Sequence, residues 1–129
     1  MWDYVISNNA FVSRYDQPDE TLSTGKWVVN FPLNDPDDLW DRLVTAASFG
    51  RIAAVKRSSE RLDKIAGHHI ACVYCRSSDE ETVKRTLALL REIGVSGPLR
   101  YKSDKATVEG RDEYLYESDL LEGGPGPGP

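Results

Sequence analysis

The stretch that decides the fold of this 129-residue chain is residues 69–81, which read His69-Ile70-Ala71-Cys72-Val73-Tyr74-Cys75-Arg76-Ser77-Ser78-Asp79-Glu80-Glu81. Its first seven residues are almost continuously apolar, which is typical of a central strand covered on both faces. The residues that follow form a capping box, in which the hydroxyl of Ser78 and the carboxylate of Glu81 bind free backbone amides at a helix start. A buried strand that leads at once into a capped helix predicts helices packed on a sheet.

The same pattern extends outward over residues 25–105. Before the central strand, the acidic run around Asp35 and Pro36 predicts the start of a first helix, and Gly50 suits its C-terminal end. Alternating apolar residues predict three further strands, at 26–31, 51–56 and 99–103. We therefore expect an α/β (α+β) fold in the order β-α-β-β-α-β, formed by a single domain over residues 25–116.

The two ends of the chain lie outside this pattern. Residues 1–24 are weakly patterned and are expected to form an N-terminal packing segment and a loop. Residues 117–129 are acidic and then alternate Gly with Pro, a composition that predicts a disordered tail.

Composition favours a cytoplasmic protein. No apolar run approaches the roughly 20 residues that span a bilayer, and the N-terminus lacks the regions of a secretory signal. Cys72 and Cys75 lie on a predicted strand, where residues three apart project to opposite faces. We expect buried thiols there, with no metal, no cofactor and no membrane partner.

Charge is unevenly distributed along the chain. The net charge is −5, yet residues 51–105 hold twelve Lys and Arg against seven Asp and Glu. A basic core inside an acidic protein favours a specific anionic ligand over a diffuse polyanion such as duplex DNA. Six cations lie within or at the end of predicted strands and could converge on one cleft: Lys26, Lys56, Arg57, Arg76, Arg100 and Lys102. Arg offers a bidentate fork to phosphate and Lys a point charge, although each residue could also be a solvated strand end.

Aromatic and imidazole side chains are the other candidates. Tyr101, with Trp27 and Tyr74, could stack on a ring of the ligand, the alternative being that these residues belong to the core. His68 and His69 could serve as an acid or base, because histidine titrates near neutrality. The alternative is a polar strand end.

Several short motifs carry a family resemblance. They are Gly25-Lys26-Trp27, Leu39-Trp40, Val55-Lys56, Cys72-Val73-Tyr74 and Leu99-Arg100-Tyr101-Lys102-Ser103-Asp104. In this order, over about residues 24–116, they resemble the small basophilic-leukaemia-expressed Bles03 family. The resemblance implies an eIF4E-like fold, a curved, mainly antiparallel sheet with two main helices on one face. Relatives of eIF4E bind a phosphorylated nucleotide cap between aromatic rings and cations, so the resemblance also implies a phosphorylated ligand.

Members of this family are also labelled as phosphothreonine lyases. β-Elimination needs a base, which would be Lys26 or Lys56, and usually an acid, which would be His68 or His69. The first strand contains Lys26 but no histidine, which is where this chain departs from the lyase pattern.

Three functions follow from these observations. The first is a domain that binds a phosphorylated ligand, such as a nucleotide, an RNA end or a phosphopeptide, in a basic cleft. The second is a lyase that eliminates phosphate from phosphothreonine or phosphoserine. The third is a protein-interaction module, in which the basic patch binds an acidic partner or the acidic C-terminal segment of the chain itself.

Overall fold

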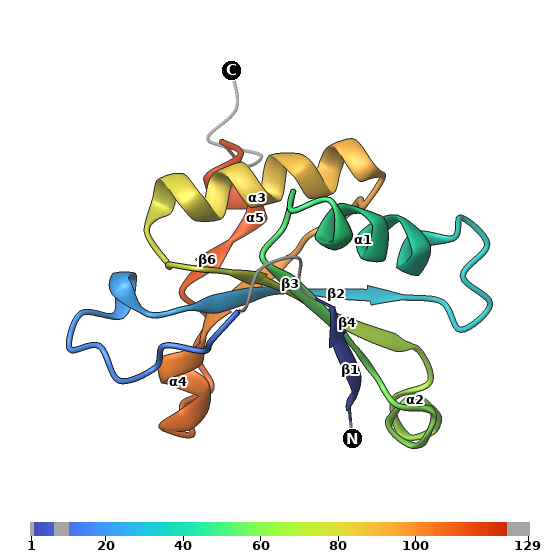
Figure 1. Ribbon diagram of the computed structural model, residues 1–129, viewed down its shortest axis with the longest axis horizontal. Helices are drawn as coiled ribbons and strands as arrows, with labels where there is room; N and C mark the ends of the chain where they lie inside the picture. The colour runs from blue at the N-terminus through green and yellow to red at the C-terminus, as the bar shows by residue number, and fades with distance from the viewer. Residues whose placement is uncertain (1, 7–10, 124–129) are drawn as a thin grey trace.

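Six strands form one antiparallel sheet within residues 2–6 and 11–123, the part of the chain that the computed structural model describes. The strand order is β1-β3-β4-β2-β5-β6, and every neighbouring pair is antiparallel (Figure 1). The strands are β1 (Trp2–Ile6), β2 (Gly25–Phe31), β3 (Ala54–Ser58), β4 (His69–Cys75), β5 (Arg100–Ser103) and β6 (Tyr116–Glu117). Residues 69–75 thus form a central strand, β4, with the predicted bounds.

The two faces of the sheet have different surroundings, which the pairing of β2 with β4 makes clear. β2 pairs with β4 from Gly25 opposite Cys75 to Phe31 opposite His69. Because side chains alternate along a strand, Trp27 and Val29 project to one face and Lys26 projects to the other. We call the first the helix face and the second the open face.

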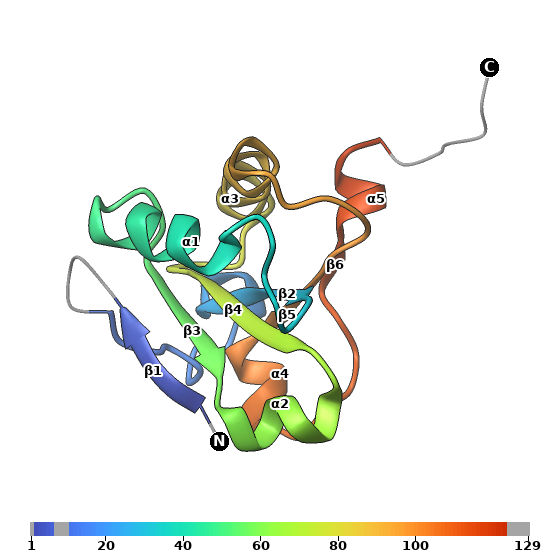
Figure 2. The same cartoon turned by 90° about the vertical axis from the view of Figure 1, so that its right-hand side faces the viewer.

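The two long helices pack on the helix face. They are α1 (Leu39–Ser48) and α3 (Glu80–Ile93), which lie side by side above the sheet (Figures 1 and 2). Their buried stripes include Leu43 on α1 and Leu87 on α3, in one cluster with Trp27 and Val73 of the sheet. The expected α/β fold, with two main helices on one face in the order β-α-β-β-α-β, is confirmed.

Four shorter helical segments complete the described fold: η1 (Glu20–Leu22), α2 (Glu60–Ala66), α4 (Asp104–Val108) and α5 (Ser118–Leu121). Figure 1 shows α2 and α4 on the side of the sheet away from α1 and α3, one near each end of the strands. Both begin at a serine whose hydroxyl accepts a backbone N–H, Ser59 for α2 and Ser103 for α4.

The residues that cap the starts of α1 and α3 differ from the predicted ones. The Asp35 carboxylate accepts from the backbone N–H of Leu39 and of Trp40, so it caps a helix that begins four residues later. On α3 the N-cap is Asp79 rather than Ser78. The Ser78 hydroxyl points into the fold, where it lies 2.8 Å from the hydroxyl of Tyr101.

Residues 117–121, which were expected to be part of the disordered tail, belong to the fold. β6 and α5 are part of the fold, because the backbone of Ser118 donates to Leu99 O at 2.9 Å and its hydroxyl accepts from Leu99 N at 2.8 Å. Leu121 packs against the main core. The Gly/Pro residues 124–129 lie outside the described residues, while β1 gives residues 2–6 a place at the sheet edge.

Gly25 lies against the ring of the buried Tyr101. A Cβ at this position would fall 2.6 Å from Cζ of Tyr101, and Tyr101 is fully buried and tied to Ser78. We therefore expect Gly25→Ala to lower the free energy of unfolding by about 1–3 kcal/mol through overpacking. Urea unfolding followed by circular dichroism measures this, and an unchanged midpoint would contradict the close approach.

Candidate functional site

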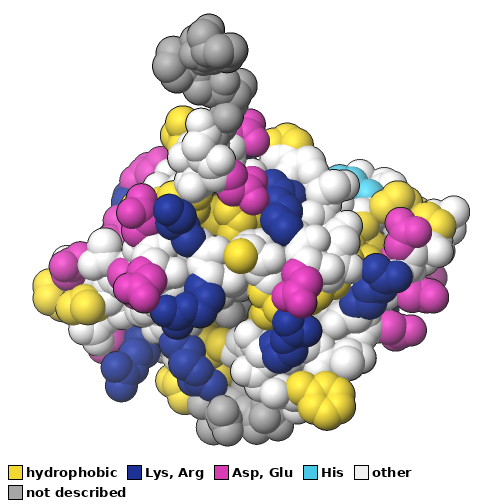
Figure 3. All heavy atoms as spheres, turned by 90° about the horizontal axis from the view of Figure 1, so that it is seen from above, with side chains coloured by type: hydrophobic (Ala, Val, Ile, Leu, Met, Phe, Trp, Pro, Cys, Tyr) yellow, Lys and Arg dark blue, Asp and Glu magenta, His cyan; other side chains and the backbone are white. Residues whose placement is uncertain are grey.

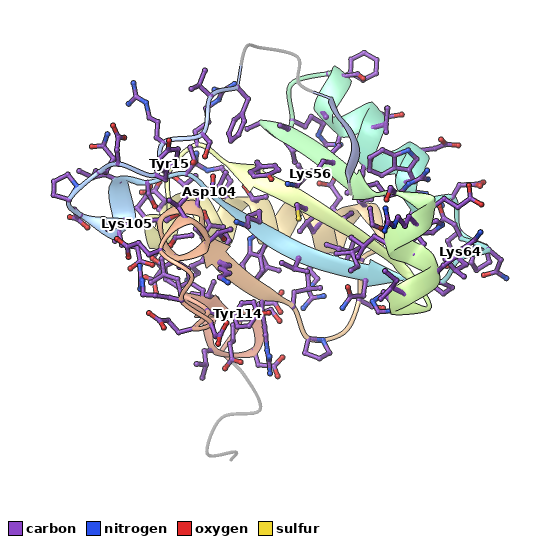
Figure 4. The ribbon with its side chains drawn as sticks, turned by 90° about the horizontal axis from the view of Figure 1, so that it is seen from below. Tyr15, Lys56, Lys64, Asp104, Lys105 and Tyr114 are labelled. Carbon is purple, nitrogen blue, oxygen red and sulfur yellow. The ribbon has the colours of Figure 1, made fainter. Side chains whose placement is uncertain are left out.

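A hollow on the open face is the candidate site. Its volume is about 480 Å³, and it lies between the sheet, the segment 11–15 and α4. We call it the open-face hollow; its lining residues are Phe11, Ser13, Tyr15, Lys26, Lys56, Tyr74, Asp104, Thr107 and Val108. Figure 4 looks onto this side: Tyr15 and Asp104 lie next to each other, Lys56 lies farther along the sheet, and Lys64 lies at the opposite end on α2.

Strand register brings the two lysines of the hollow to the same face. Lys26 on β2 lies opposite Tyr74 on β4, and Lys56 on β3 lies opposite Cys72 on β4. Tyr74 and Cys72 are two residues apart on one strand, so all four side chains project to the open face. Two of the six predicted cations thus line one hollow.

Lys26 is held by a buried carboxylate. Its ammonium donates to Asp104 Oδ1 at 2.9 Å and to Thr107 Oγ1 at 2.6 Å, and both Lys26 and Asp104 are more than 90% buried. The other oxygen of Asp104 accepts from Thr24 at 2.6 Å and from Ser13 at 2.9 Å. The charge of Lys26 is therefore compensated, and this Lys26–Asp104 clamp forms a wall of the hollow.

Sequence reasoning did not single out Asp104 as a site residue. Asp104 lies at the start of a short helix, 78 positions along the chain from Lys26, and no spacing pattern connects the two. The available signal was local: Asp104 directly follows the strand that carries Lys102, which lies opposite Lys26 in the sheet.

Aromatic rings surround the second lysine. The Lys56 ammonium lies 5.7 Å from the ring centre of Tyr74, and the ring of Phe11 lies 5.1 Å from that of Tyr74. Burial raises the pKa of the Tyr74 hydroxyl, so this group stays protonated at neutral pH. Tyr15 is about half exposed at the rim. The hollow therefore combines a cation with flat apolar surfaces.

Two predicted site residues belong elsewhere. Arg57 follows Lys56 on β3 and so projects to the helix face, where its guanidinium lies 5.1 Å from the ring of Trp40. Tyr101 is fully buried on the helix face, with its ring 5.4 Å from that of Trp27. Strand alternation is the reason in both cases, and neither residue lines the open-face hollow.

The remaining predicted cations do not line the hollow. Arg100 forms an ion pair with Glu117 at 3.4 Å and stacks 5.2 Å from the ring of Tyr114. Lys102 lies beside Lys26 in the sheet, on the side away from Lys56. Arg76 lines a different hollow, described below.

The two histidines do not join the lysines. His69 is the first residue of β4, at the other end of the strand from Tyr74, where Nδ1 is 2.7 Å from Asp63 Oδ2 of α2 and Nε2 is 3.1 Å from Leu33 O. It is five positions along β4 from Tyr74, roughly 17 Å at the rise of a strand. His68, in the turn before β4, does not line the hollow either. The acid and base of an elimination are thus not brought together.

The cysteines are buried on opposite faces, as predicted. Cys72 packs in a small cluster with Ala54 and Tyr74, and Cys75 packs in the main core. Over residues 11–123, whose side chains the structure describes, no group of three His, Cys, Asp or Glu is placed to hold a metal ion. No helix in the described part of the chain is long and apolar enough to cross a membrane.

The fold is eIF4E-like. The structure is similar to that of a schistosome eIF4E complexed with m7GpppA and 4E-BP, with a TM-score of 0.56 at 17% sequence identity. The match covers 73% of this chain and spans 58% of that one. The family model of basophilic leukemia-expressed protein Bles03 matches residues 18–108, and the chain belongs to this family. Among curated proteins none matches. The expected family and fold are both confirmed.

Proposed function

We propose that this domain binds a phosphorylated small ligand, in the first place a nucleotide, in the open-face hollow. The proposal rests on one observation. Lys26, Lys56 and three aromatic residues line the same hollow of about 480 Å³. Hollows of roughly 300–1,000 Å³, mostly apolar with a few placed polar groups, are typical of small-ligand sites.

Each part of the hollow has a role in this proposal. Lys56 supplies a point charge for a phosphate group. The rings of Phe11, Tyr15 and Tyr74 offer flat surfaces for a base, and such stacking tolerates every base because each has a π-face. The Asp104 carboxylate is already engaged by Lys26, Ser13 and Thr24, so its repulsion of a phosphate is reduced.

The solved relative gives independent support. The schistosome eIF4E with the same fold was complexed with m7GpppA, a ligand that carries phosphates. At 17% identity this likeness concerns the fold, so it supports the ligand class and not particular contacts. An RNA end and a phosphopeptide remain other carriers of the same phosphate chemistry.

The geometry favours binding over the two other functions. A lyase needs a base and an acid at one ligand, whereas Lys26 is engaged by Asp104 and His69 is engaged by Asp63 at the start of β4, away from the hollow. An internal competitor would need the acidic C-terminal segment in the hollow. Glu117 and Glu122 pair instead with Arg100 and Arg91, outside the lining of the hollow.

Substitution of Lys56 tests the proposal. We expect Lys56→Gln to weaken binding of a nucleoside triphosphate about tenfold, because it removes a charge-assisted contact to phosphate. Tyr15→Ala should weaken it by a similar factor through lost stacking. Isothermal titration calorimetry on the full chain measures both.

Matched controls lie on the same side of the molecule (Figure 4). Lys64 is exposed on α2, and Tyr114 is partly exposed beside Arg100. Lys64→Gln and Tyr114→Ala should leave the affinity unchanged. The proposal is wrong if the wild-type chain takes up no nucleotide at millimolar concentration, or if Lys64→Gln weakens binding as much as Lys56→Gln.

A further inference from the structure

Three arginines from three separate segments line a second hollow. Arg51 lies between α1 and β3, Arg76 directly follows β4, and Arg85 lies on α3. The space between them is about 200 Å³, and we call it the arginine hollow. In Figure 3, which looks down on the helix side, Lys and Arg side chains gather at the lower left.

Local structure explains the convergence. α1 ends at Ser48, and Gly50 has a φ of 77°, a left-handed conformation that turns the chain beneath α3. Arg51 therefore reaches α3, where it contacts Glu92. Arg76 follows the last residue of β4, at the end of the sheet from which the chain enters α3. Arg85 lies in the second turn of α3.

The present partners of these arginines are weakly held. Arg51 pairs with Glu92 at 2.9 Å and Arg85 pairs with Glu81 at 2.9 Å, and all four side chains are more than half exposed. Such exposed pairs contribute about 0–1 kcal/mol and exchange readily. Among the described residues no carboxylate forms an ion pair with Arg76, whose guanidinium lies 5.9 Å from the ring of Phe11.

The two threonines of the hollow are already engaged. Thr82 donates its hydroxyl to Asp79, the N-cap of α3, at 3.0 Å. Thr86 interacts with the thiol of Cys75. The guanidinium groups are therefore the donors left to bind a ligand, and a guanidinium presents a planar fork that matches the oxygens of a phosphate.

We propose that the arginine hollow is an anion site that binds a phosphate group. Within the described part of the chain, three cations line it and no carboxylate does, while the carboxylates that pair with Arg51 and Arg85 from outside the lining are exposed and exchangeable. The small volume suits a single tetrahedral anion rather than a base and sugar as well. The site differs from the open-face hollow in its cations, because neither Lys26 nor Lys56 lines it, although Tyr74 lines both hollows. It stands whether or not the open-face hollow binds a nucleotide.

Inorganic phosphate is the probe for this site. We expect its addition to the full chain at low ionic strength to shift the backbone amides of Arg51, Arg76 and Arg85 along a saturating curve in ¹H–¹⁵N spectra. Arg76→Gln and Arg85→Gln should each weaken binding about tenfold. A Glu81→Gln/Glu92→Gln double variant should strengthen it a few-fold, because the internal competitors are gone.

A control variant tests whether the effect is specific to this site. Arg61, exposed on α2, is the matched control, and Arg61→Gln should leave the phosphate affinity read from the amides of Arg51, Arg76 and Arg85 unchanged. A nucleoside monophosphate serves as a second probe. If it binds at least as tightly as inorganic phosphate, the site accepts a phosphate group attached to a larger molecule. If it binds more weakly, the site prefers free phosphate. Shifts that rise linearly without saturation, or that sodium chloride at equal ionic strength reproduces, would overturn the proposal. So would an equal loss of affinity in Arg61→Gln.

Discussion

Asp104→Ala should lower the free energy of unfolding by about 3–5 kcal/mol, because it leaves the ammonium of Lys26 buried and without its counter-ion. Lys26 and Asp104 are 8% and 6% exposed, so water cannot replace the lost carboxylate. The hydroxyls of Thr24 and Ser13 lose their acceptor in the same substitution. Urea unfolding of the variant and of the wild type measures the difference.

Two further variants make this expectation specific. A Lys26→Met/Asp104→Leu double variant removes both charges and should recover part of the loss, because replacing a buried pair by apolar residues is often close to neutral. Glu109→Ala removes an exposed carboxylate that pairs with Lys105, and it should cost less than about 1 kcal/mol. Equal stability of Asp104→Ala and Glu109→Ala would show that the clamp contributes little.

The clamp also bears on the proposed function. Asp104 connects the segment 11–24, through Ser13 and Thr24, to β2 and to α4. These elements form the rim of the open-face hollow, where Phe11 and Tyr15 lie. Loss of the clamp should therefore weaken ligand binding by moving the rim, even though Asp104 itself is expected to make no contact with phosphate.

The parts of the fold that the sequence predicts are those with a local signal. The bounds of β4 follow from its run of apolar residues, and α3 follows from an acidic start and an amphipathic stripe. Residues 58–67, which contain the seven-residue α2, predict a loop or one helical turn, and the five-residue α4 was not predicted as a helix. A single serine cap in a polar stretch does not distinguish a short helix from a loop.

The sequence predicts which neighbouring residues on a strand lie on opposite faces, but not which face stays free of helices or which residues meet there. Strand alternation places Lys56 and Arg57 on opposite faces, yet the face that helices cover is decided by packing over the whole chain. Arg51 and Arg85 had no strand to mark them, so their meeting with Arg76 appears only in three dimensions. The covered face of the sheet and the convergence of the three arginines both depend on contacts between residues distant in sequence, and local sequence patterns do not show such contacts.

Alkaline pH should unfold this protein, since four buried acidic groups must stay protonated in the native state. Burial is the main cause of the rise, and it brings the pKa of Cys72 and that of Cys75 from 9.0 to about 11. It also raises the pKa values of Tyr74 and Tyr101. Between pH 9 and 11 the thiols therefore ionise in the unfolded chain but not in the folded one.

The sign of the effect follows from proton binding. Above pH 9 the unfolded state holds fewer protons than the native state, so the free energy of unfolding falls as pH rises, by about 5 kcal/mol for the two thiols at pH 11. Below pH 9 their contribution is constant. Urea midpoints measured from pH 7 to 10.5 under reducing conditions test this. A Cys72→Ala/Cys75→Ala variant should be less stable at pH 7, because it creates cavities, yet lose less stability between pH 9 and 10. Equal slopes in the variant and the wild type would show that the thiols are not the groups that titrate.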